Sequence, residues 1–300
     1  MFNSFLVYLI SFLFFSGGIW ANINWPQFSY GEIIKIDQSG YFKDKINSLP
    51  DPEVSASSIA VLDLNNNFFV LEKNSEQVWP IASISKIMST LVLLEDVDIN
   101  LEEDYKVTAE DRRLGGRDYI FVGDELSNYD LLALSLIASD NTAIIALISS
   151  AGLEETDFVD LMNARAQKMN LEKTKFYDAS GLSSLNVSTA KEVSLLLKEA
   201  LKREEILELL KKYNYKVVTK NGRVQNIQST NELLNYTNNG IEVLAGKTGY
   251  NDLAGYCLTT KFLLDNNREF ISVVLNASTL KNRFADTRRI VEELYNFYNN

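Results

Sequence analysis

The sequence contains no histidine among its 300 residues and only one cysteine, Cys257. Without histidine a serine nucleophile has no imidazole base, so every mechanism built on a Ser-His pair is excluded and a lysine is the natural replacement. One thiol permits no internal disulfide. Zinc and most transition metals also lose their usual ligands. We therefore expect no metal site and no cofactor.

Positive charge is also scarce, with 29 Lys and Arg residues against 40 Asp and Glu residues and a net charge of −11. Such a surface repels phosphate backbones, so nucleic acid is not an expected partner. The chain has only 4 prolines, and 46% of its residues are hydrophobic, which is typical of a globular protein. Its length suits one large domain or two small lobes.

The first residues form the longest apolar run. Residues 5–15 are almost wholly apolar, and the small residues Ser16, Gly17, Gly18 and Ala21 follow. This pattern predicts a signal peptide over residues 1–21. An uncleaved N-terminal helix stays an alternative, because no Lys or Arg precedes the apolar run. Either interpretation predicts an exported protein, periplasmic or otherwise extracytoplasmic, and residues 22–54 then form a lead-in.

Hydrophobic periodicity predicts strands at the two ends of the remaining chain and helices between them. Expected strands are 58–63, 68–71, 216–219, 243–248, 256–262 and 270–276. Expected helices are 83–94, 129–149, 154–168, 189–201 and 283–298, and Thr189-Ala190-Lys191-Glu192 predicts a capping box at the start of the fourth. The pattern indicates an α+β fold in which a mixed, mostly antiparallel sheet is flanked by helices and carries an inserted helical lobe. We expect a single domain at 55–298, with a sheet lobe at about 55–80 and 215–298, a helical lobe at about 83–212, and no C-terminal β-domain.

The segment from Asp63 to Asn67 begins like a calcium-binding loop. Phe68, however, occupies the position that needs glycine, and Asn74 the position that needs a bidentate glutamate. We expect a turn between two strands there.

Ser83 and Lys86 lie three residues apart at the start of a predicted helix. This spacing puts the hydroxyl and the amine on one face, and the helix N-terminus adds partial positive charge where an oxyanion would form. To act as a base, Lys86 must be desolvated or placed near a second cation, for which Lys247 is the candidate. The motif alone is not specific, because the same spacing occurs at Ser188–Lys191 and Ser278–Lys281, where we expect ordinary surface residues.

Two further motifs follow in order. Ser139-Asp140-Asn141 interrupts an apolar helical stretch, where three polar side chains are costly unless they form hydrogen bonds. Ser139 would relay a proton to a leaving group and Asn141 would bind a substrate amide. In Lys247-Thr248-Gly249, the lysine and threonine would bind a carboxylate, and the glycine lets another backbone approach closely.

The three motifs together are typical of class A β-lactamases and penicillin-binding proteins. From about residue 55 to residue 298 the chain resembles the serine D-alanyl-D-alanine carboxypeptidases and endopeptidases, the low-molecular-mass penicillin-binding proteins of peptidase family S11. The similarity includes the contexts Trp79 to Met88, Asp178 to Ala190, Ser229 to Leu234 and Gly246 to Cys257. It implies a transpeptidase-like fold, peptidoglycan stem peptides as substrates and β-lactams as covalent inhibitors.

The resemblance also implies a role for each motif residue. Ser83 is the acylated nucleophile, Lys86 its base and Ser139 the proton relay. The substrate contacts are Asn141, Lys247, Thr248, Gly249 and Tyr250, and the backbone N–H groups of Ser83 and Tyr250 form the oxyanion hole. Oligomeric state, and the choice between carboxypeptidase and endopeptidase, stay open.

Two alternatives are weighed against this interpretation. A class A β-lactamase needs a glutamate in a Glu-x-x-Leu-Asn loop, and here Leu182 occupies that position in Leu182-Ser183-Ser184-Leu185-Asn186. A non-catalytic wall-binding protein with the same fold would be expected to lack the nucleophile or the lysine, and this chain has both.

Overall fold

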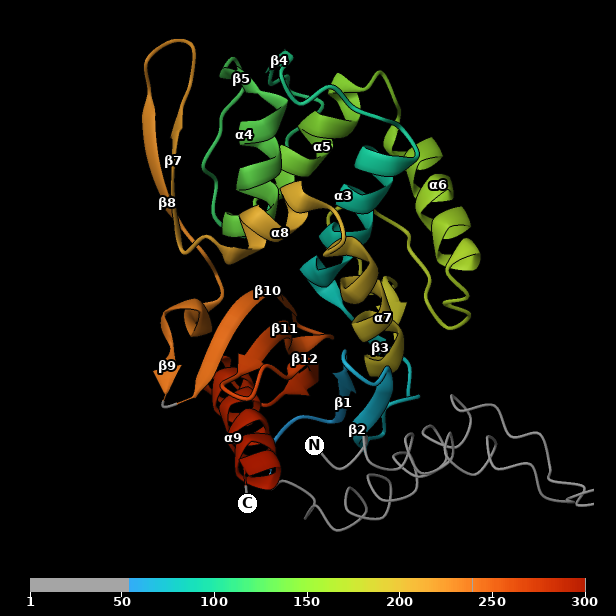
Figure 1. Ribbon diagram of the computed structural model, residues 1–300. Helices are drawn as coiled ribbons and strands as arrows, with labels where there is room; N and C mark the ends of the chain where they lie inside the picture. Colours follow the sequence, from blue (N-terminus) through green and yellow to red (C-terminus); the bar gives the residue numbers. More distant parts are fainter. Residues whose placement is uncertain (1–53, 239, 300) are drawn as a thin grey trace, which may run out of the picture. The chain divides into compact units, whose positions relative to one another are not determined.

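The computed structural model describes residues 54–238 and 240–299 (Figure 1). The predicted signal peptide, and all of the lead-in except Val54, lie outside the described residues. The two ends of the described chain build one six-stranded sheet with the order β2-β1-β12-β11-β10-β9. Its strands are β1 (Ser58–Asp63), β2 (Phe68–Lys73), β9 (Thr237–Asn238), β10 (Ile241–Asn251), β11 (Gly255–Leu264) and β12 (Glu269–Ala277). Every pairing in it is antiparallel.

The central strands are apolar on both faces because helices cover both sides of the sheet. Ile271, Val273 and Leu275 of β12 belong to the main core, which they share with helix α7 (Ala190–Ala200). On the opposite face, Leu258 of β11 packs against Phe284 of helix α9 (Leu280–Asn299). This sheet with helices on both faces confirms the α+β class.

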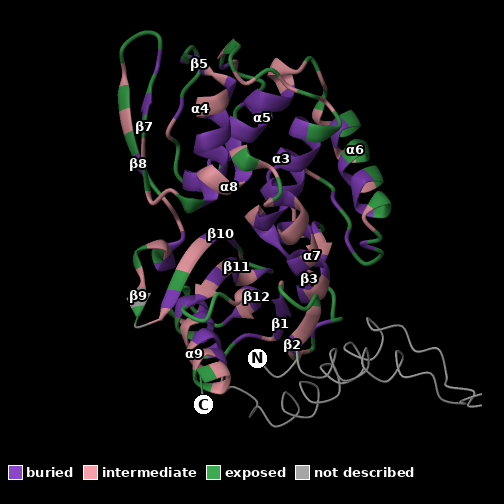
Figure 2. Ribbon diagram, viewed as in Figure 1, coloured by how far each residue is buried: buried purple, intermediate pink, exposed green. Residues whose placement is uncertain are grey.

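The remaining helices gather above the sheet in the view of Figure 1. They are α3 (Ser85–Glu95), α4 (Asn128–Ala133), α5 (Asn141–Ser150), α6 (Glu155–Lys168) and α8 (Glu204–Lys211). Short helical turns are η1 (Ala82–Ile84), the π-helical η2 (Leu134–Ala138) and η3 (Glu232–Asn235). Helix α3 is buried along almost its whole length, in contact with α5, α6 and α7 (Figure 2).

Three two-stranded ribbons complete the described elements. Strand β3 (Trp79–Pro80) pairs with β6 (Val187–Ser188), and β4 (Asp104–Lys106) pairs with β5 (Glu125–Ser127). The hairpin of β7 (Asn214–Val218) and β8 (Val224–Gln228) is a separate sheet. We expected residues from 215 onward in the sheet lobe, but Tyr215 donates a hydrogen bond to Asp130 of α4, which ties the hairpin to the helices.

Several local predictions are confirmed. The Asp63 carboxylate accepts hydrogen bonds from the backbone N–H groups of Asn65 and Asn66, which makes the asparagine-rich segment a turn between β1 and β2. Thr189 caps α7 by accepting from the N–H of Glu192. Helix α8 and strand β8 were not predicted. Among the described residues, no helix is long and apolar enough to cross a membrane.

Candidate active site

Ser83 lies in the short turn η1, just before α3, and glycines allow the backbone around it to pack closely. The turn begins at Ala82, whose φ of 46° is left-handed. Gly181, with φ of 84°, packs on this turn so closely that a Cβ there would contact the carbonyl of Ala82 and lie 2.7 Å from the Ser83 nitrogen. A Cβ on Gly249 would lie 2.5 Å from the carbonyl oxygen of Ile81. The predicted close approach at Gly249 is confirmed, and Gly181 is a second such position.

Lys86 is fully buried and its amine faces three acceptors. Its Nζ lies 3.2 Å from the Ser83 hydroxyl, 2.6 Å from Asn141 Oδ1 and 2.5 Å from the carbonyl oxygen of Ser180. Burial lowers the pKa of Lys86 to about 7, although Asp140 and Asp178 favour the charged form. A substantial fraction of Lys86 is therefore the neutral amine near pH 7, with a lone pair beside the serine hydroxyl.

Ser139, Asp140 and Asn141 interrupt the helical segment between η2 and α5, as the sequence predicts. After η2, Ser139 adopts a left-handed φ of 63°, and Asp140 caps α5 by accepting from the N–H of Ala143. The other Asp140 oxygen accepts from the N–H of Tyr119. Asp140 is therefore used in local structure, which leaves Ser139 and Asn141 to face the site.

Lys247 lies beside Ser139 and is also buried. Its Nζ donates to the Ser139 hydroxyl at 2.7 Å and to the carbonyl of Thr248 at 3.1 Å. Its pKa is lowered well below the ordinary value, first by burial and then by the positive charges of Lys86 and Arg283. We expected a nearby cation to be one of two ways of lowering the pKa of Lys86, and the structure gives burial as the main cause.

Strand β10 carries the motif Lys247-Thr248-Gly249 at an edge of the six-stranded sheet. Strand β9 pairs with β10 only at Ile241 and Glu242, so within the described residues no strand pairs with the rest of that edge. The turn η1 packs against β10. The backbones of Ser83 and Tyr250 therefore lie on two elements that are in contact. The Tyr250 side chain is half exposed and stacks on Tyr256, with ring centroids 4.4 Å apart. The Thr248 hydroxyl bonds the Thr230 hydroxyl at 2.6 Å.

Arg283 of α9 adds a third buried cation behind this strand. Its side chain donates to the carbonyl of Gly249 at 3.4 Å, while its Nε has no hydrogen-bond partner. Burial lowers the pKa of Arg283 to about 10. Of the ion pairs among the described residues, none includes Lys86, Lys247 or Arg283. Three buried basic side chains, none of them in an ion pair, make this part of the site suited to an anionic group.

A loop after α6 holds the carbonyl that Lys86 contacts. One oxygen of Asp178 accepts from the N–H groups of Ser180 and Gly181, and the other from the N–H of Ser183. This loop is tied to α3 through Asn186, whose side-chain amide donates to the Ser85 hydroxyl and to the carbonyl of Asp178. Sequence reasoning placed this loop in the family context but gave Asp178 no role.

The remaining candidates from the sequence lie elsewhere. Ser188 is buried and bonds Thr174, which corrects our expectation of a surface residue, and Lys191 pairs with Glu72 and Glu76. Ser278 and Lys281 are exposed. Within the described residues, no cluster of three His, Cys, Asp or Glu side chains could hold a metal ion.

The geometry has the parts of a serine acyl-transfer site with a lysine base: a hydroxyl beside a desolvated amine, a second hydroxyl beside a second lysine, and an open strand edge. The family model described as D-alanyl-D-alanine carboxypeptidase matches residues 45–279. The chain belongs to this family of serine peptidases, S11.

Characterised relatives agree with this assignment. The chain is 31% identical over 244 residues to a D-alanyl-D-alanine endopeptidase of Escherichia coli, covering 80% of this chain and 77% of that protein. It is 28% identical to a D-alanyl-D-alanine carboxypeptidase of Bacillus subtilis, covering 81% of this chain and 63% of that protein.

Solved structures share the fold. The ampicillin-bound penicillin-binding protein D2 of Listeria monocytogenes matches with a TM-score of 0.70 and 33% identity, over 81% of this chain and 99% of that one. A Streptomyces DD-transpeptidase matches with a TM-score of 0.71 and 21% identity, over 81% of this chain and 98% of that one. The expected transpeptidase-like fold is confirmed.

Proposed function

We propose that this chain is a serine-type D-Ala-D-Ala carboxypeptidase that removes the terminal D-alanine from peptidoglycan stem peptides through an acyl-enzyme on Ser83. The observation that carries the proposal is the contact of Lys86 Nζ with the Ser83 hydroxyl at 3.2 Å, because burial makes this lysine a base near pH 7. Family membership and the similarity to D-alanyl-D-alanine peptidases support the choice of substrate.

Acylation follows from the positions of the side chains. Ser83 Oγ attacks the carbonyl carbon of the penultimate D-alanine while its proton passes to the neutral amine of Lys86. The backbone N–H groups of Ser83 and Tyr250 stabilise the oxyanion. The C–N bond then breaks, and the departing amine takes a proton through the Ser139 hydroxyl, which Lys247 contacts at 2.7 Å.

Substrate binding uses the remaining motif residues. Lys247 and Thr248 bind the carboxylate of the leaving D-alanine, whose negative charge is the ion-pair partner that Lys247 and Arg283 otherwise lack. Asn141 binds the substrate amide. Water then cleaves the serine ester with Lys86 as base, which releases the shortened peptide and returns the Ser83 hydroxyl.

β-Lactams are expected to acylate the same serine, as the ampicillin-bound relative suggests. The β-lactamase alternative is not favoured, because Leu182 has no group that can take a proton. The non-catalytic alternative is not favoured either, because serine and lysine are both present and in contact. We also propose that the protein acts outside the cytoplasm, where peptidoglycan lies.

A penicillin-labelling experiment tests this proposal. Wild-type protein should bind fluorescent penicillin covalently and release D-alanine from a synthetic D-Ala-D-Ala peptide. Ser83→Ala and Lys86→Ala should do neither, while Lys281→Ala, an exposed change on α9, should behave as wild type. Labelling of Ser83→Ala at the wild-type rate would show that another residue is acylated.

A further inference from the structure

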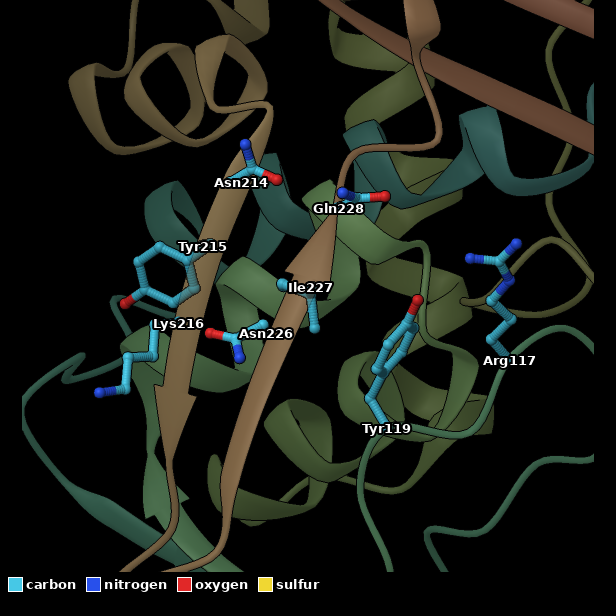
Figure 3. Close-up of a pocket in the computed structure, with 8 residues that line it drawn as sticks. All are labelled: Arg117, Tyr119, Asn214, Tyr215, Lys216, Asn226, Ile227 and Gln228. Carbon is cyan, nitrogen blue, oxygen red and sulfur yellow. The ribbon is translucent and has the colours of Figure 1, made fainter.

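Thr230 lies in the segment between β8 and η3 and contacts the substrate-binding motif of β10. Figure 3 shows Gln228 at the end of β8, and Thr230 follows two residues later. The Thr230 hydroxyl lies 2.6 Å from the Thr248 hydroxyl. Thr248 is only 4% exposed and Lys247 only 1%, whereas Thr230 is partly exposed. Thr230 is therefore the residue of this group that a ligand arriving from solvent reaches most easily.

The two hydroxyl groups together have one hydrogen to spare. A threonine hydroxyl has one hydrogen to donate and two lone pairs with which to accept. Thr248 donates its hydrogen to Thr230, so the hydrogen of Thr230 is left for another acceptor, and no other described residue accepts it. The bond from Thr248 also polarises the Thr230 hydroxyl, which makes it a stronger donor.

The neighbours of Thr230 on both sides fix its backbone. Ser229 donates its N–H to the Tyr213 carbonyl at 2.7 Å. Asn231 is fully buried, and its side chain caps η3. The Asn231 amide nitrogen lies 2.8 Å from the place that a Cβ on Gly246 of β10 would occupy, so the glycine allows this segment to pack on the strand. Thr230 is therefore in position before any substrate binds.

Thr230 also connects the edge of the sheet to η2. Its backbone N–H donates to the Ile137 carbonyl at 3.1 Å, two residues before Ser139. The Ser139 hydroxyl accepts from Lys247 at 2.7 Å, and Lys247 lies on the same strand as Thr248. Thr230 therefore joins the two segments that contact the leaving group in the proposed reaction.

We propose that Thr230 is a further substrate-binding residue, which donates its hydroxyl hydrogen to the anionic group that Lys247 binds. The inference rests on the proposed function, in which this group is the carboxylate of the leaving D-alanine. A hydrogen bond to a carboxylate is stronger than one to a neutral oxygen. Thr230 therefore favours a peptide that ends in a carboxylate over one that ends in an amide, and it is a specificity-determining residue.

The test compares two linear peptides that differ only in their last group, one ending in D-Ala-D-Ala with a free carboxylate and one with a C-terminal amide. The measured quantity is kcat/KM, from release of D-alanine or D-alaninamide. Thr230→Val replaces the hydroxyl by a methyl group. It should lower kcat/KM about tenfold on the carboxylate peptide, the size expected for one charge-assisted hydrogen bond, and by less than about twofold on the amide peptide. Thr230→Ser keeps a hydroxyl and should recover most of the loss.

The control is Thr156→Val, the same exchange at an exposed position of α6, which should match wild type on both peptides. Melting temperatures verify that each variant is folded. Thr230→Ala removes the same hydroxyl and provides the comparison if the valine variant does not fold.

The outcomes separate the two proposals. Equal losses of Thr230→Val on both peptides would show a structural role and overturn the inference, as would wild-type kcat/KM on the carboxylate peptide. A serine variant as slow as the valine variant would also overturn it. In each of these cases wild-type protein still releases D-alanine, and the proposed carboxypeptidase stands. Wild-type protein that neither releases D-alanine nor binds penicillin would overturn the proposed function, and the inference with it.

Discussion

Arg113 and Glu155 form an ion pair at 2.7 Å. The pair connects two segments that fix the hydrogen-bond acceptors of Lys86, the loop that contains Gly115 and the loop that contains Ser180. The second Glu155 oxygen accepts from the N–H of Ala179, next to Ser180, whose carbonyl accepts from Lys86. Arg113 lies two residues before Gly115, whose carbonyl holds the amide of Asn141. Glu155, at the start of α6, is therefore a positioning residue for both fixed acceptors of Lys86.

Glu155→Ala removes both connections, so we expect Lys86 to lose its fixed orientation and kcat for D-alanine release to fall by ten- to a hundredfold, roughly the cost of a displaced catalytic group. KM should change little, because Glu155 forms no hydrogen bond or ion pair with Lys247 or Thr248, which bind the substrate carboxylate in the proposed reaction. Glu155→Gln can keep only one of the two connections, because an amide cannot accept from both donors, and should give an intermediate kcat. The measurement is steady-state kinetics over a range of pH.

The control for this series is Lys202→Ala, which breaks an exposed ion pair with Glu199 far from the motif residues. Exposed pairs contribute between about 0 and 1 kcal/mol, so this variant should match wild type in kcat and in its pH profile. Equal kcat in Glu155→Ala and Lys202→Ala would show that Glu155 has no positioning role.

The rate of acylation by penicillin should depend on the ionisation of Lys86. The reactive form is the neutral amine, and burial lowers the pKa of Lys86 to about 7. Below that pH the amine is protonated, so the second-order acylation rate should fall about tenfold for each further pH unit; above it the rate should level off. Stopped-flow measurement between pH 5 and 9 checks this. A rate that still rises about tenfold per pH unit at pH 9 would mean that Lys86 is solvated and keeps the ordinary lysine pKa.

The same pKa shift has a consequence for stability. The folded-state pKa of Lys86 lies below its unfolded value of 10.5. Between these two values the unfolded chain binds more protons, so the contribution of Lys86 to stability improves as pH rises from about 7 toward 10.5. Below pH 7 both states are protonated, and the cost of burying the ammonium group is fully present.

Gly181→Ala should disturb Ser83 directly. A Cβ at this position would contact the Ala82 carbonyl and lie 2.7 Å from the Ser83 nitrogen, and the φ of 84° is itself unfavourable for alanine. We expect a lower melting temperature and loss of penicillin labelling. Gly152→Ala is the matched control, because its φ of 71° is similar but nothing lies within 4 Å of the added Cβ. That variant should lose only about 1–2 kcal/mol of stability and keep its labelling rate. Similar labelling rates in the two variants would contradict the prediction.

The sequence predicts those parts of the structure that depend on residues close together in the chain, and it does not predict contacts between residues that are far apart in the chain. Local patterns predict the five longer strands of the main sheet and most helices, and the cap at Thr189 is confirmed. Glu192, however, accepts from the Lys173 N–H and the Thr174 hydroxyl instead of closing a capping box. The β7–β8 hairpin has ordinary strand residues, and only the contact of Tyr215 with Asp130 shows which part of the fold it joins.

The candidate site also contains residues that the sequence predicts and residues that only the structure reveals. Three motifs predict which side chains meet, and the structure brings Ser83, Lys86 and Asn141 into one hydrogen-bonded group. Glu155 and Arg283 could not be found from the sequence, because each looks like an ordinary charged residue of a helix. Their importance comes from backbone groups that are distant in the chain, and no local pattern reports such contacts.

The last prediction concerns the lifetime of the penicilloyl-enzyme. A class A β-lactamase hydrolyses its penicilloyl ester rapidly with a carboxylate that activates water, and Leu182, 41% exposed, occupies the position where the sequence comparison would place that carboxylate. The neighbouring Asp178 cannot substitute, because both its oxygens accept backbone N–H bonds that hold the loop together. We therefore expect a burst of nitrocefin cleavage equal to one equivalent of enzyme, followed by turnover slower than about one per minute, well below the typical enzymatic kcat of about 1 to 1000 per second. Multiple rapid turnovers by pure wild-type protein, absent in Ser83→Ala, would instead show that another group activates the deacylating water.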